Sequence, residues 1–196
     1  MIVVKVGGSL YDHPRLGPGL RAYLASLAPE TILLVPGGGA FANAVRQLDA
    51  THQLGEERAH WLALWSLDIP AEFLRVLLLP DAEEILAIHP IIDRWESDSP
   101  RGIRVLKALG FCRLNHQLPH TWDVTSDSIA GQAAVIYRAT RLILLKSIAV
   151  PSGPPWLDAA QAGWVDPFFP WAVADFPGTI EVLNFRRWLD ETPPMP

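Results

Sequence analysis

Blocks of apolar residues alternate with mixed stretches along the chain, and this pattern predicts strands separated by helices. Two apolar runs, Ile2–Val6 and Thr31–Val35, each lead almost directly into consecutive glycines. Apolar runs of this kind are typical of parallel strands that are buried on both faces. Segments Pro18–Leu27 and Phe41–Leu48 carry apolar residues at helical spacing. This β-α-β-α beginning predicts parallel strands joined by right-handed crossovers.

The rest of the chain continues the alternation. Helical spacing runs over Gly55–Ser66, "AEFLRVLLL" fits either a helix end or a strand, and a strand or short connection is expected near Ile85–Ile88. "RGIRVLKALG" fits a helix or a strand before a loop, and an apolar helix begins near Ser126. "RLILLKS" and "TIEVLNF" are predicted strands, with "RRWLDE" as a short cap. These elements predict a three-layer α/β/α sandwich with a mainly parallel central sheet.

Composition narrows the class of protein. The 196 residues suffice for one core, and no composition break divides them, so a single domain over residues 1–196 is expected. A net charge of -5 argues against broad nucleic-acid binding. No apolar run approaches the roughly 20 residues of a membrane helix, and no signal-peptide pattern opens the chain, so a cytoplasmic protein without membrane contact is expected. The single cysteine, Cys112, excludes an internal disulfide framework and is expected in the core.

Two glycine turns follow the first two predicted strands. In "VVKVGGSL", Lys5 precedes Gly7 and Gly8, and in "VPGGGA" the run Gly37–Gly39 precedes a helix. Glycines let backbone N–H groups approach an anion closely, and a helix N-terminus favours negative charge. The lysine precedes the glycines, so the first turn is not a Walker A loop. Each turn alone also fits a tightly packed connection, but two at the carboxyl edge of one sheet favour an anion site.

A third candidate segment is "DVTSDSIAGQAA". Thr125 or Ser126 can cap the following helix, and Asp127 falls in its first turn, so ordinary capping explains part of this composition. The alternative is that the hydroxyls bind an acceptor while Asp127 orients Lys5 during phosphoryl transfer. Such transfer depends mainly on positioning and charge stabilisation, for which a lysine, glycine amides and an organising acid are suited.

These motifs resemble a known family when they are taken together. "VVKVGGSL", "LLVPGGGAFANAVRQLD" and "HTWDVTSDSIA", followed by the strand "LILL", look like the amino-acid kinase superfamily, which includes acetylglutamate, aspartate, uridylate and isopentenyl phosphate kinases. The second and third motifs are most similar to the small kinases of methanofuran biosynthesis, which act on an aminomethylfuran-methyl phosphate. The resemblance covers about the first 150 residues well and the remainder loosely.

The resemblance implies transfer of the γ-phosphoryl group of ATP to a phosphate or carboxylate acceptor, with Mg²⁺ bridging the ATP phosphates and no metal ligands from the protein. It also implies a homodimer or higher oligomer. An acceptor-binding part is expected in 1–140, a reduced nucleotide-binding part in 141–190 and a tail in 191–196. The implied catalytic residues are Lys5, Asp127 and Lys146; the implied nucleotide-phosphate ligands are Gly7, Gly8, Ser9 and Ser147; the implied acceptor ligands are Gly37, Gly38, Gly39, Thr125 and Ser126.

One segment departs from the family pattern. Family members usually carry a Thr-Asp-Val-Asp-Gly type loop after this strand, whereas this chain has "LKSIAVPSG", with Lys146 and Ser147 in place of Thr-Asp. Lys146 either adds a second positive charge for the phosphates or extends from the strand end into solvent. Two alternatives to an ATP-dependent kinase follow. In the first, the chain is a non-catalytic relative that binds a phosphorylated metabolite or serves as an assembly subunit. In the second, it is a kinase that uses another phosphoryl donor.

Several histidines are further candidates for site residues. His60, together with Asp68, can approach an acceptor, although a packing or solvent-facing role is favoured. His116 and His120 lie four residues apart, but Pro119 between them argues against the continuous helix that a histidine metal pair needs.

The tryptophans have core or interface explanations. Trp61 and Trp65 share one helical face, which predicts that they fill a core or a subunit interface. Trp156, Trp164 and Trp171 lie among prolines, where they can close a pocket or an interface.

Overall fold

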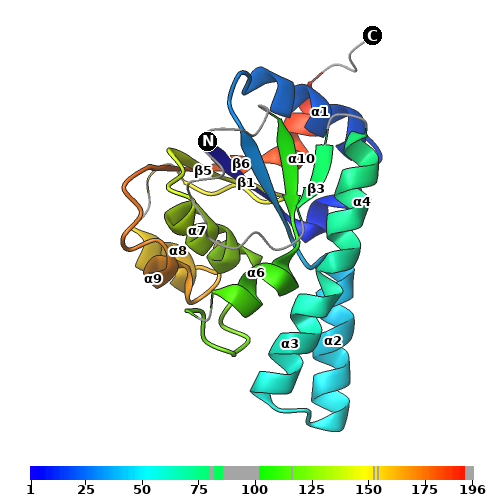
Figure 1. Cartoon of the computed structure of the whole chain (residues 1–196), viewed down its shortest axis with the longest axis vertical. Helices are drawn as coiled ribbons and strands as arrows, with labels where there is room; N and C mark the ends of the chain where they lie inside the picture. The colour runs from blue at the N-terminus through cyan, green and yellow to red at the C-terminus, as the bar shows by residue number, and fades with distance from the viewer. Residues whose placement is uncertain (80–81, 86–101, 116, 152, 154, 193–196) are drawn as a thin grey trace.

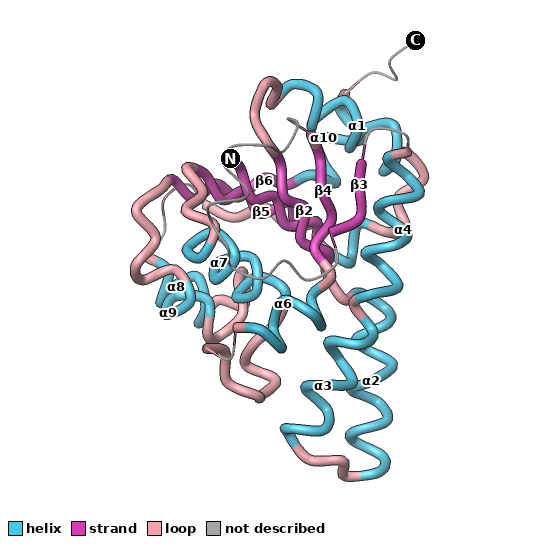
Figure 2. The backbone as a smooth tube through the Cα atoms, viewed as in Figure 1, coloured by secondary structure: helices cyan, strands magenta, loops and turns pink. Residues whose placement is uncertain are grey.

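The computed structural model describes residues 1–79, 82–85, 102–115, 117–151, 153 and 155–192. Six strands form one sheet in the order β3-β4-β2-β1-β5-β6, and every neighbouring pair is parallel (Figures 1 and 2). The strands are β1 (Ile2–Val6), β2 (Ile32–Pro36), β3 (Ala82–Ile85), β4 (Ile103–Leu106), β5 (Arg141–Lys146) and β6 (Thr179–Asn184). The prediction of a mainly parallel central sheet is therefore confirmed.

Helices cover both faces of this sheet (Figure 1). They are η1 (Gly8–Leu10), α1 (Leu16–Ser26), α2 (Gly39–His52), α3 (Glu56–Ser66), α4 (Asp68–Leu78), α6 (Ala108–Leu114), α7 (Ser126–Ile136), α8 (Trp156–Gln161), α9 (Phe169–Ala172) and α10 (Phe185–Glu191). Helices α1, α4 and α10 share one hydrophobic core, and α6, α7, α8 and α9 share the other. The architecture is the predicted three-layer sandwich, in which α2 and α3 extend beyond the sheet as a pair.

Successive residues of a strand belong alternately to the two cores. In β1, Val3 belongs to the core under α7, whereas Ile2, Val4 and Val6 belong to the core under α1. Since successive strand residues point to opposite faces, Lys5 shares the face of Val3. Burial of both faces explains why these strands are continuous apolar runs in the sequence, and the alternation places the one lysine of β1 on the α7 side.

The structure resolves the ambiguous segments. "AEFLRVLLL" lies in helix α4, and "RGIRVLKALG" contains strand β4 followed by helix α6. The strand or short connection predicted near Ile85–Ile88 overlaps the last residue of β3 at Ile85, and 86–88 lie outside the described residues. Cys112 is buried in the core as expected. In the described part of the chain, no helix combines the length and apolar character needed to cross a membrane.

Candidate active site

The turns that follow β1, β2 and β5 meet at one edge of the sheet. These strands are neighbours, and their carboxyl ends lie together because all three are parallel. The Gly7 N–H donates to the Leu145 carbonyl at 2.8 Å, and the Gly37 N–H donates to the Val6 carbonyl at 2.8 Å. Backbone hydrogen bonds thus join the three strand ends that carry these turns.

The two glycine turns pack directly on each other. A Cβ added to Gly8 would lie 2.2 Å from the Gly39 nitrogen, and one added to Gly37 would lie 2.4 Å from the Gly8 nitrogen. Gly39 also has a φ of 54°, in the left-handed region that favours glycine. Close packing therefore requires glycine here whether or not a ligand binds. The same packing holds Gly8, Gly38 and Gly39 at the wall of a cavity.

A buried carboxylate joins two lysines at this edge. Asp127, in the first turn of α7, is 4% exposed, and its Oδ1 lies 2.9 Å from Lys5 Nζ. Its Oδ2 lies 2.5 Å from Lys146 Nζ. Lys146 therefore does not extend into solvent, because it pairs with Asp127. One carboxylate between two ammonium groups leaves a net positive charge beside the glycine turns, as a site for a negatively charged group requires.

The charges within this triad are mutually dependent. Burial raises the pKa of Asp127, but the Coulomb attraction of Lys5 and then of Lys146 outweighs it and holds that pKa below its usual value. Burial lowers the pKa of Lys146, and attraction to Asp127 opposes that change only in part. Asp127 is therefore ionised at neutral pH, and it keeps both ammonium groups turned toward the same point.

The start of helix α7 is fixed by an acid that sequence reasoning did not find. Thr125 caps the helix, since its Oγ1 accepts from the Asp127 N–H. Asp166 Oδ2 accepts from the Thr125 N–H at 2.9 Å, the Thr125 hydroxyl at 2.8 Å and the Ser128 N–H at 2.9 Å, and its Oδ1 accepts from the Ser128 hydroxyl. The capping interpretation of Thr125 is correct, but the cap is itself held from "VDPFFPW", about forty residues away along the chain.

An Asp166→Ala variant is expected to lower the free energy of unfolding by about 2–4 kcal/mol, because two N–H groups and two hydroxyls of the Thr125–Ser128 turn lose their acceptor. Urea unfolding measures the loss. Asp175→Ala removes an exposed carboxylate and is expected to change stability by no more than about 0.5 kcal/mol. Equal stability losses in the two variants would contradict the anchoring role.

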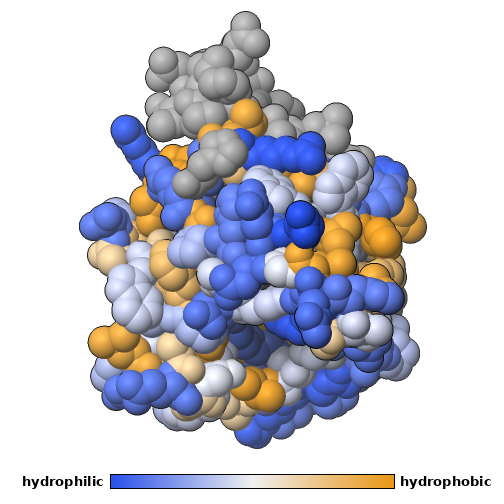
Figure 3. Space-filling view, turned by 90° about the horizontal axis from the view of Figure 1, so that it is seen from below, coloured by the Kyte–Doolittle hydropathy of each residue, from blue (hydrophilic) through white to orange (hydrophobic). Residues whose placement is uncertain are grey.

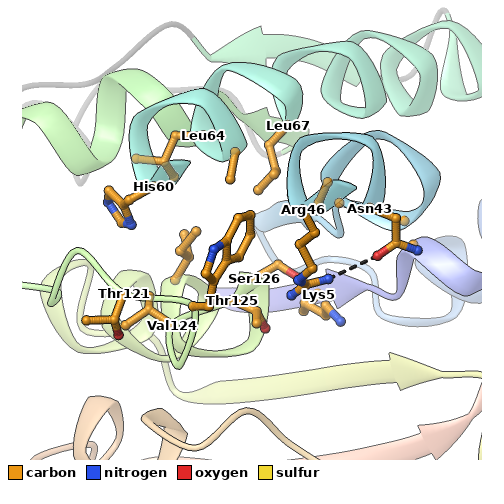
Figure 4. A pocket seen from close by; sticks show the side chains of 17 residues that line it. Lys5, Asn43, Arg46, His60, Leu64, Leu67, Thr121, Val124, Thr125 and Ser126 are labelled. Carbon is orange, nitrogen blue, oxygen red and sulfur yellow. Dashed lines mark hydrogen bonds between the residues drawn. The ribbon is translucent and has the colours of Figure 1, made fainter. Parts of the chain in front are cut away.

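A cavity of about 210 Å³ opens beside the triad. Its polar end is formed by Lys5, Arg46 and Ser126 with the Gly38–Gly39 backbone, so the first turns of α2 and α7 both border it. Figure 4 shows Lys5, Arg46 and Ser126 gathered at one side of this cavity. Helix N-termini and side-chain cations both favour anions. The described lining contains cationic and neutral side chains and no carboxylate.

The other end of the cavity is apolar and aromatic. Its apolar lining comes from α2, α3, the junction of α3 and α4, the loop before α7 and α7 itself: Ala42, Ala63, Leu64, Leu67, Val124 and Ile129. In Figure 4, His60, Leu64 and Leu67 lie on one side, and Thr121 and Val124 face them from the other. The cavity therefore has a cationic end and an apolar end.

His60 lines this cavity and is 6% exposed. Its ring stacks on His120 with centroids 4.5 Å apart. Burial, together with the neighbouring His120, lowers the pKa of His60 to about 4. His60 is therefore neutral at physiological pH. Asp68, its suggested companion, borders a separate surface hollow with Trp65 and is not among the residues that line the cavity.

His60 is expected to make the protein less stable in mild acid. Its folded pKa of about 4 lies below the ordinary 6.5, so the unfolded chain takes up the proton first as the pH falls. The stability attributable to His60 is lost between pH 6.5 and about 4. Urea midpoints measured over this window should fall less steeply in His60→Asn than in the wild type. The exposed His52→Asn variant should follow the wild type, and an unchanged slope in His60→Asn would contradict the assignment.

Of the four predicted nucleotide-phosphate residues, Gly8 lines the cavity, whereas Gly7, Ser9 and Ser147 do not. Ser9 and Ser147 share a hydrogen bond of 2.8 Å between their hydroxyls, which brings together two strand exits that are 138 residues apart. Arg186 of α10 donates to the Ser9 carbonyl and to Asp12. Gly7 is buried, and its N–H donates to the Leu145 carbonyl of β5. It therefore stabilises the turn.

Gly37, a predicted acceptor ligand, and His120 do not line the cavity in the described structure. Gly37 is buried, accepts a hydrogen bond from the Tyr11 hydroxyl at 2.8 Å and is not among the lining residues. His116 lies outside the described residues, and His120 stacks on His60. Within the described ranges, no cluster of three or more His, Cys, Asp or Glu side chains is arranged to hold a metal ion.

The two tryptophans of α3 lie in different surroundings. Trp61 packs against the α7-side core and contacts His120, whereas Trp65 is 56% exposed. Arg113 lies over both rings, at 5.9 Å from the Trp61 centroid and 5.6 Å from that of Trp65. Of the C-terminal tryptophans, Trp156 and Trp164 pack against the core, and Trp171 is exposed.

Comparison with known proteins gives a sequence relative and several structural ones. A stretch of 131 residues, 66% of this chain, is 30% identical to (5-(aminomethyl)furan-3-yl)methyl phosphate kinase of Methanocaldococcus jannaschii and spans 58% of that protein's length. No family model matches the chain. The match therefore supports relatedness over part of each protein.

The similar solved structures are kinases that match nearly the whole chain. Uridylate kinase from Archaeoglobus fulgidus aligns with a TM-score of 0.67 and 14% identity over 97% of this chain and 95% of that one. UMP kinase from Bacillus anthracis aligns with a TM-score of 0.67 and 16% identity over 97% and 92%. An isopentenyl phosphate kinase aligns with a TM-score of 0.57 and 14% identity over 96% of each chain.

The parallel sheet with its glycine turns is the fold of these uridylate, UMP and isopentenyl phosphate kinases, which is the fold of the amino-acid kinase superfamily. Over part of its length, the sequence of the chain is similar to that of the M. jannaschii (5-(aminomethyl)furan-3-yl)methyl phosphate kinase.

Proposed function

We propose that this protein transfers the γ-phosphoryl group of ATP to the phosphate group of a small acceptor and so forms a diphosphate. The observation that carries the proposal is the Lys5–Asp127–Lys146 triad, which places two ammonium groups at the meeting point of the three turns. The cavity beside the triad supplies an acceptor site with a cationic end and an apolar end.

The proposed reaction assigns a task to each side of the triad. The acceptor phosphate lies against Gly38, Gly39 and Arg46, and one of its oxygens attacks the γ-phosphorus of ATP. A new P–O bond forms, the bond between the γ-phosphorus and the β–γ bridging oxygen breaks, and ADP departs with that electron pair. Lys5 and Lys146 stabilise the negative charge that moves between acceptor and leaving group. Asp127 orients both ammonium groups.

The donor side of the proposal rests on the turn that departs from the family pattern. Ser9 and Ser147 meet through their hydroxyls, and Lys146 pairs with Asp127, so this turn presents a cation and hydroxyls where the ATP phosphates are proposed to bind. Both Asp127 oxygens are occupied by lysines. Mg²⁺ would accordingly be held by phosphate and water oxygens, where it would neutralise phosphate charge.

The finer proposal is that the acceptor is an aminomethylfuran-methyl phosphate, which would place the reaction in methanofuran-type C1 cofactor biosynthesis. The name of the M. jannaschii relative supports this acceptor. A furan ring suits the apolar end of the cavity, and its phosphate suits the Lys5 and Arg46 end. Because the described lining holds no carboxylate, the amino group would point toward the open mouth of the cavity.

The proposal is tested by calorimetry and by turnover. The protein is titrated with Mg²⁺-ATP and with aminomethylfuran-methyl phosphate, and the mixture is then followed by ³¹P NMR for ADP and a diphosphate ester. Binding of both ligands and appearance of both products are expected. Ester binding without ATP binding or turnover would instead support a non-catalytic relative. Turnover that occurs only with another phosphoryl donor would overturn ATP as the donor.

We also propose that the protein pairs with a second copy through an apolar strip on α3 and α4. The strip consists of Trp65, Ile69, Phe73 and Val76, which are 56%, 55%, 37% and 55% exposed. Figure 3 shows apolar side chains gathered at the right of the view from below, the side on which Figure 1 places α4. A continuous exposed apolar strip is typical of an interface, and a two-fold axis would set the strip against itself.

Ile69→Glu is expected to shift the protein from dimer to monomer in sedimentation-velocity measurements, because it places a charge at the centre of the proposed interface. Leu157→Glu makes the same change on α8, where Leu157 is 54% exposed, and should leave the dimer intact. A wild-type protein that sediments as a monomer at all concentrations would disprove the interface.

A further inference from the structure

The loop before α7 carries a tryptophan at the cavity wall that is attached to another element. Trp122 is half-buried and lines the cavity. Its Nε1–H donates to Asp49 Oδ2 on α2 at 2.8 Å. The guanidinium carbon of Arg46, one helical turn before Asp49, lies 4.8 Å from the centroid of the Trp122 ring. The indole is therefore held at its polar edge and on its ring by α2.

The same contacts fix the direction of Arg46. Arg46 Nη1 donates to Asn43 Oδ1 at 3.0 Å, and both residues line the cavity (Figure 4). An arginine on an exposed helix face normally samples many rotamers, and ordering it costs side-chain entropy. Stacking on Trp122 and the bond to Asn43 hold it beside the polar end of the cavity in advance. Trp122 thus contributes to the position of a phosphate-facing cation.

The shape of the apolar end gives Trp122 a second task. Leu64 and Leu67 lie across the cavity from the Thr121–Val124 loop, which contains Trp122. An indole offers a large planar surface at a low cost in conformational entropy, and it favours flat unsaturated partners over flexible chains. Aliphatic side chains and the Trp122 indole therefore line the same cavity.

We infer that Trp122, held by Asp49 and Arg46, is the specificity-determining residue of the acceptor site and selects phosphate esters with a planar unsaturated ring over esters with a flexible aliphatic chain. The inference rests on the proposed function, since it deepens the assignment of the cavity as the acceptor site. Trp122 acts by positioning the ring of the acceptor and the guanidinium of Arg46. It takes no part in the transfer of the phosphoryl group itself.

The test compares two phosphate esters by calorimetry in the absence of ATP. The probes are aminomethylfuran-methyl phosphate, which has a planar ring, and isopentenyl phosphate, which has a flexible chain. The wild type is expected to bind the ring ester about tenfold more tightly. Trp122→Leu is expected to lose that preference through weaker binding of the ring ester, and Trp122→Phe to keep part of it. Trp171→Leu, the same change at a residue that is 60% exposed, should behave as the wild type.

Several outcomes would overturn the inference. Equal losses for both esters in Trp122→Leu would reduce Trp122 to a structural support, and unchanged binding of both would remove it from the site. Absence of the ring preference in the wild type, or failure to bind either ester, would also contradict the inference. Urea midpoints of the variants identify any general loss of folding. If Trp122→Leu is unfolded, the test rests on Trp122→Phe, which should keep part of the preference for the ring ester. If the esters bind as expected but no turnover follows the addition of Mg²⁺-ATP, the proposed reaction is disproved and the inference about Trp122 is retained.

Discussion

Lys5→Ala is expected to lower kcat for phosphoryl transfer by about a thousandfold while the protein still folds. Lys5 is 7% exposed and borders the cavity, where its ammonium pairs with Asp127. In the proposed reaction this charge faces the oxygens of the transferring phosphoryl group. Removal of one preorganised electrostatic donor typically costs about a hundredfold to a thousandfold in kcat. Because Lys5 also orders the site, we expect the loss in kcat to fall at the upper end of this range.

Folding is expected to survive because Asp127 keeps a second partner. Lys146 Nζ lies 2.5 Å from Asp127 Oδ2, so the buried carboxylate remains paired in the variant. Steady-state release of ADP gives kcat, and urea unfolding gives stability. Arg187→Ala removes an exposed cation from its pair with Glu191 and is the matched control, with wild-type kcat expected. A kcat for Lys5→Ala within about tenfold of the wild type would contradict the assigned role.

Gly8→Ala is expected to destabilise the protein by about 3 kcal/mol and to lower kcat by at least about a hundredfold. The new Cβ would lie 2.2 Å from the nitrogen and 2.4 Å from the Cα of Gly39. Both are backbone atoms, so no side-chain rotation relieves the clash and one of the two turns must move. Such a movement displaces Ser9 on one side and the Gly38–Gly39 amides on the other.

A second glycine separates steric contact from backbone strain. Gly55 has a φ of 83° and a ψ of 156°, a backbone conformation that is essentially restricted to glycine, and no heavy atom lies within 4 Å of an added Cβ. Gly55→Ala therefore carries only the cost of backbone strain, about 1–3 kcal/mol. Its activity should equal that of the wild type. The comparison uses urea midpoints together with kcat. If Gly8→Ala matched Gly55→Ala in both measurements, the contact between the two turns would have no functional weight.

The sequence predicts the sheet and the three turns because their signals are local. The apolar runs of β1, β2 and β5 reflect burial on both faces, and the glycines mark the places where backbones touch. From these, parallel topology alone brings Lys5 and Asp127 to one edge of the sheet. For Lys146 the sequence leaves two alternatives, a second positive charge for the phosphates or a strand end that extends into solvent. Only the geometry, in which Lys146 pairs with Asp127, excludes the second.

The missed features depend on contacts between distant segments. Asp166 anchors the start of α7 from a proline-rich segment in which nothing marks a buried acid. Trp122 is held by Asp49, which is 73 residues away, and that register is invisible in a single sequence. Trp61 and Trp65 share a helical face by spacing, yet the loop that carries His120 covers only the first of them.

The most direct measurement of the central claim is a crystal structure with Mg²⁺, a non-hydrolysable ATP analogue and aminomethylfuran-methyl phosphate. The account predicts that the γ-phosphate lies within about 3.2 Å of Lys5 Nζ and Lys146 Nζ, with the ester phosphate at the Gly38–Gly39 turn. An ester phosphate bound away from the three turns, or a γ-phosphate out of reach of both lysines, would contradict it.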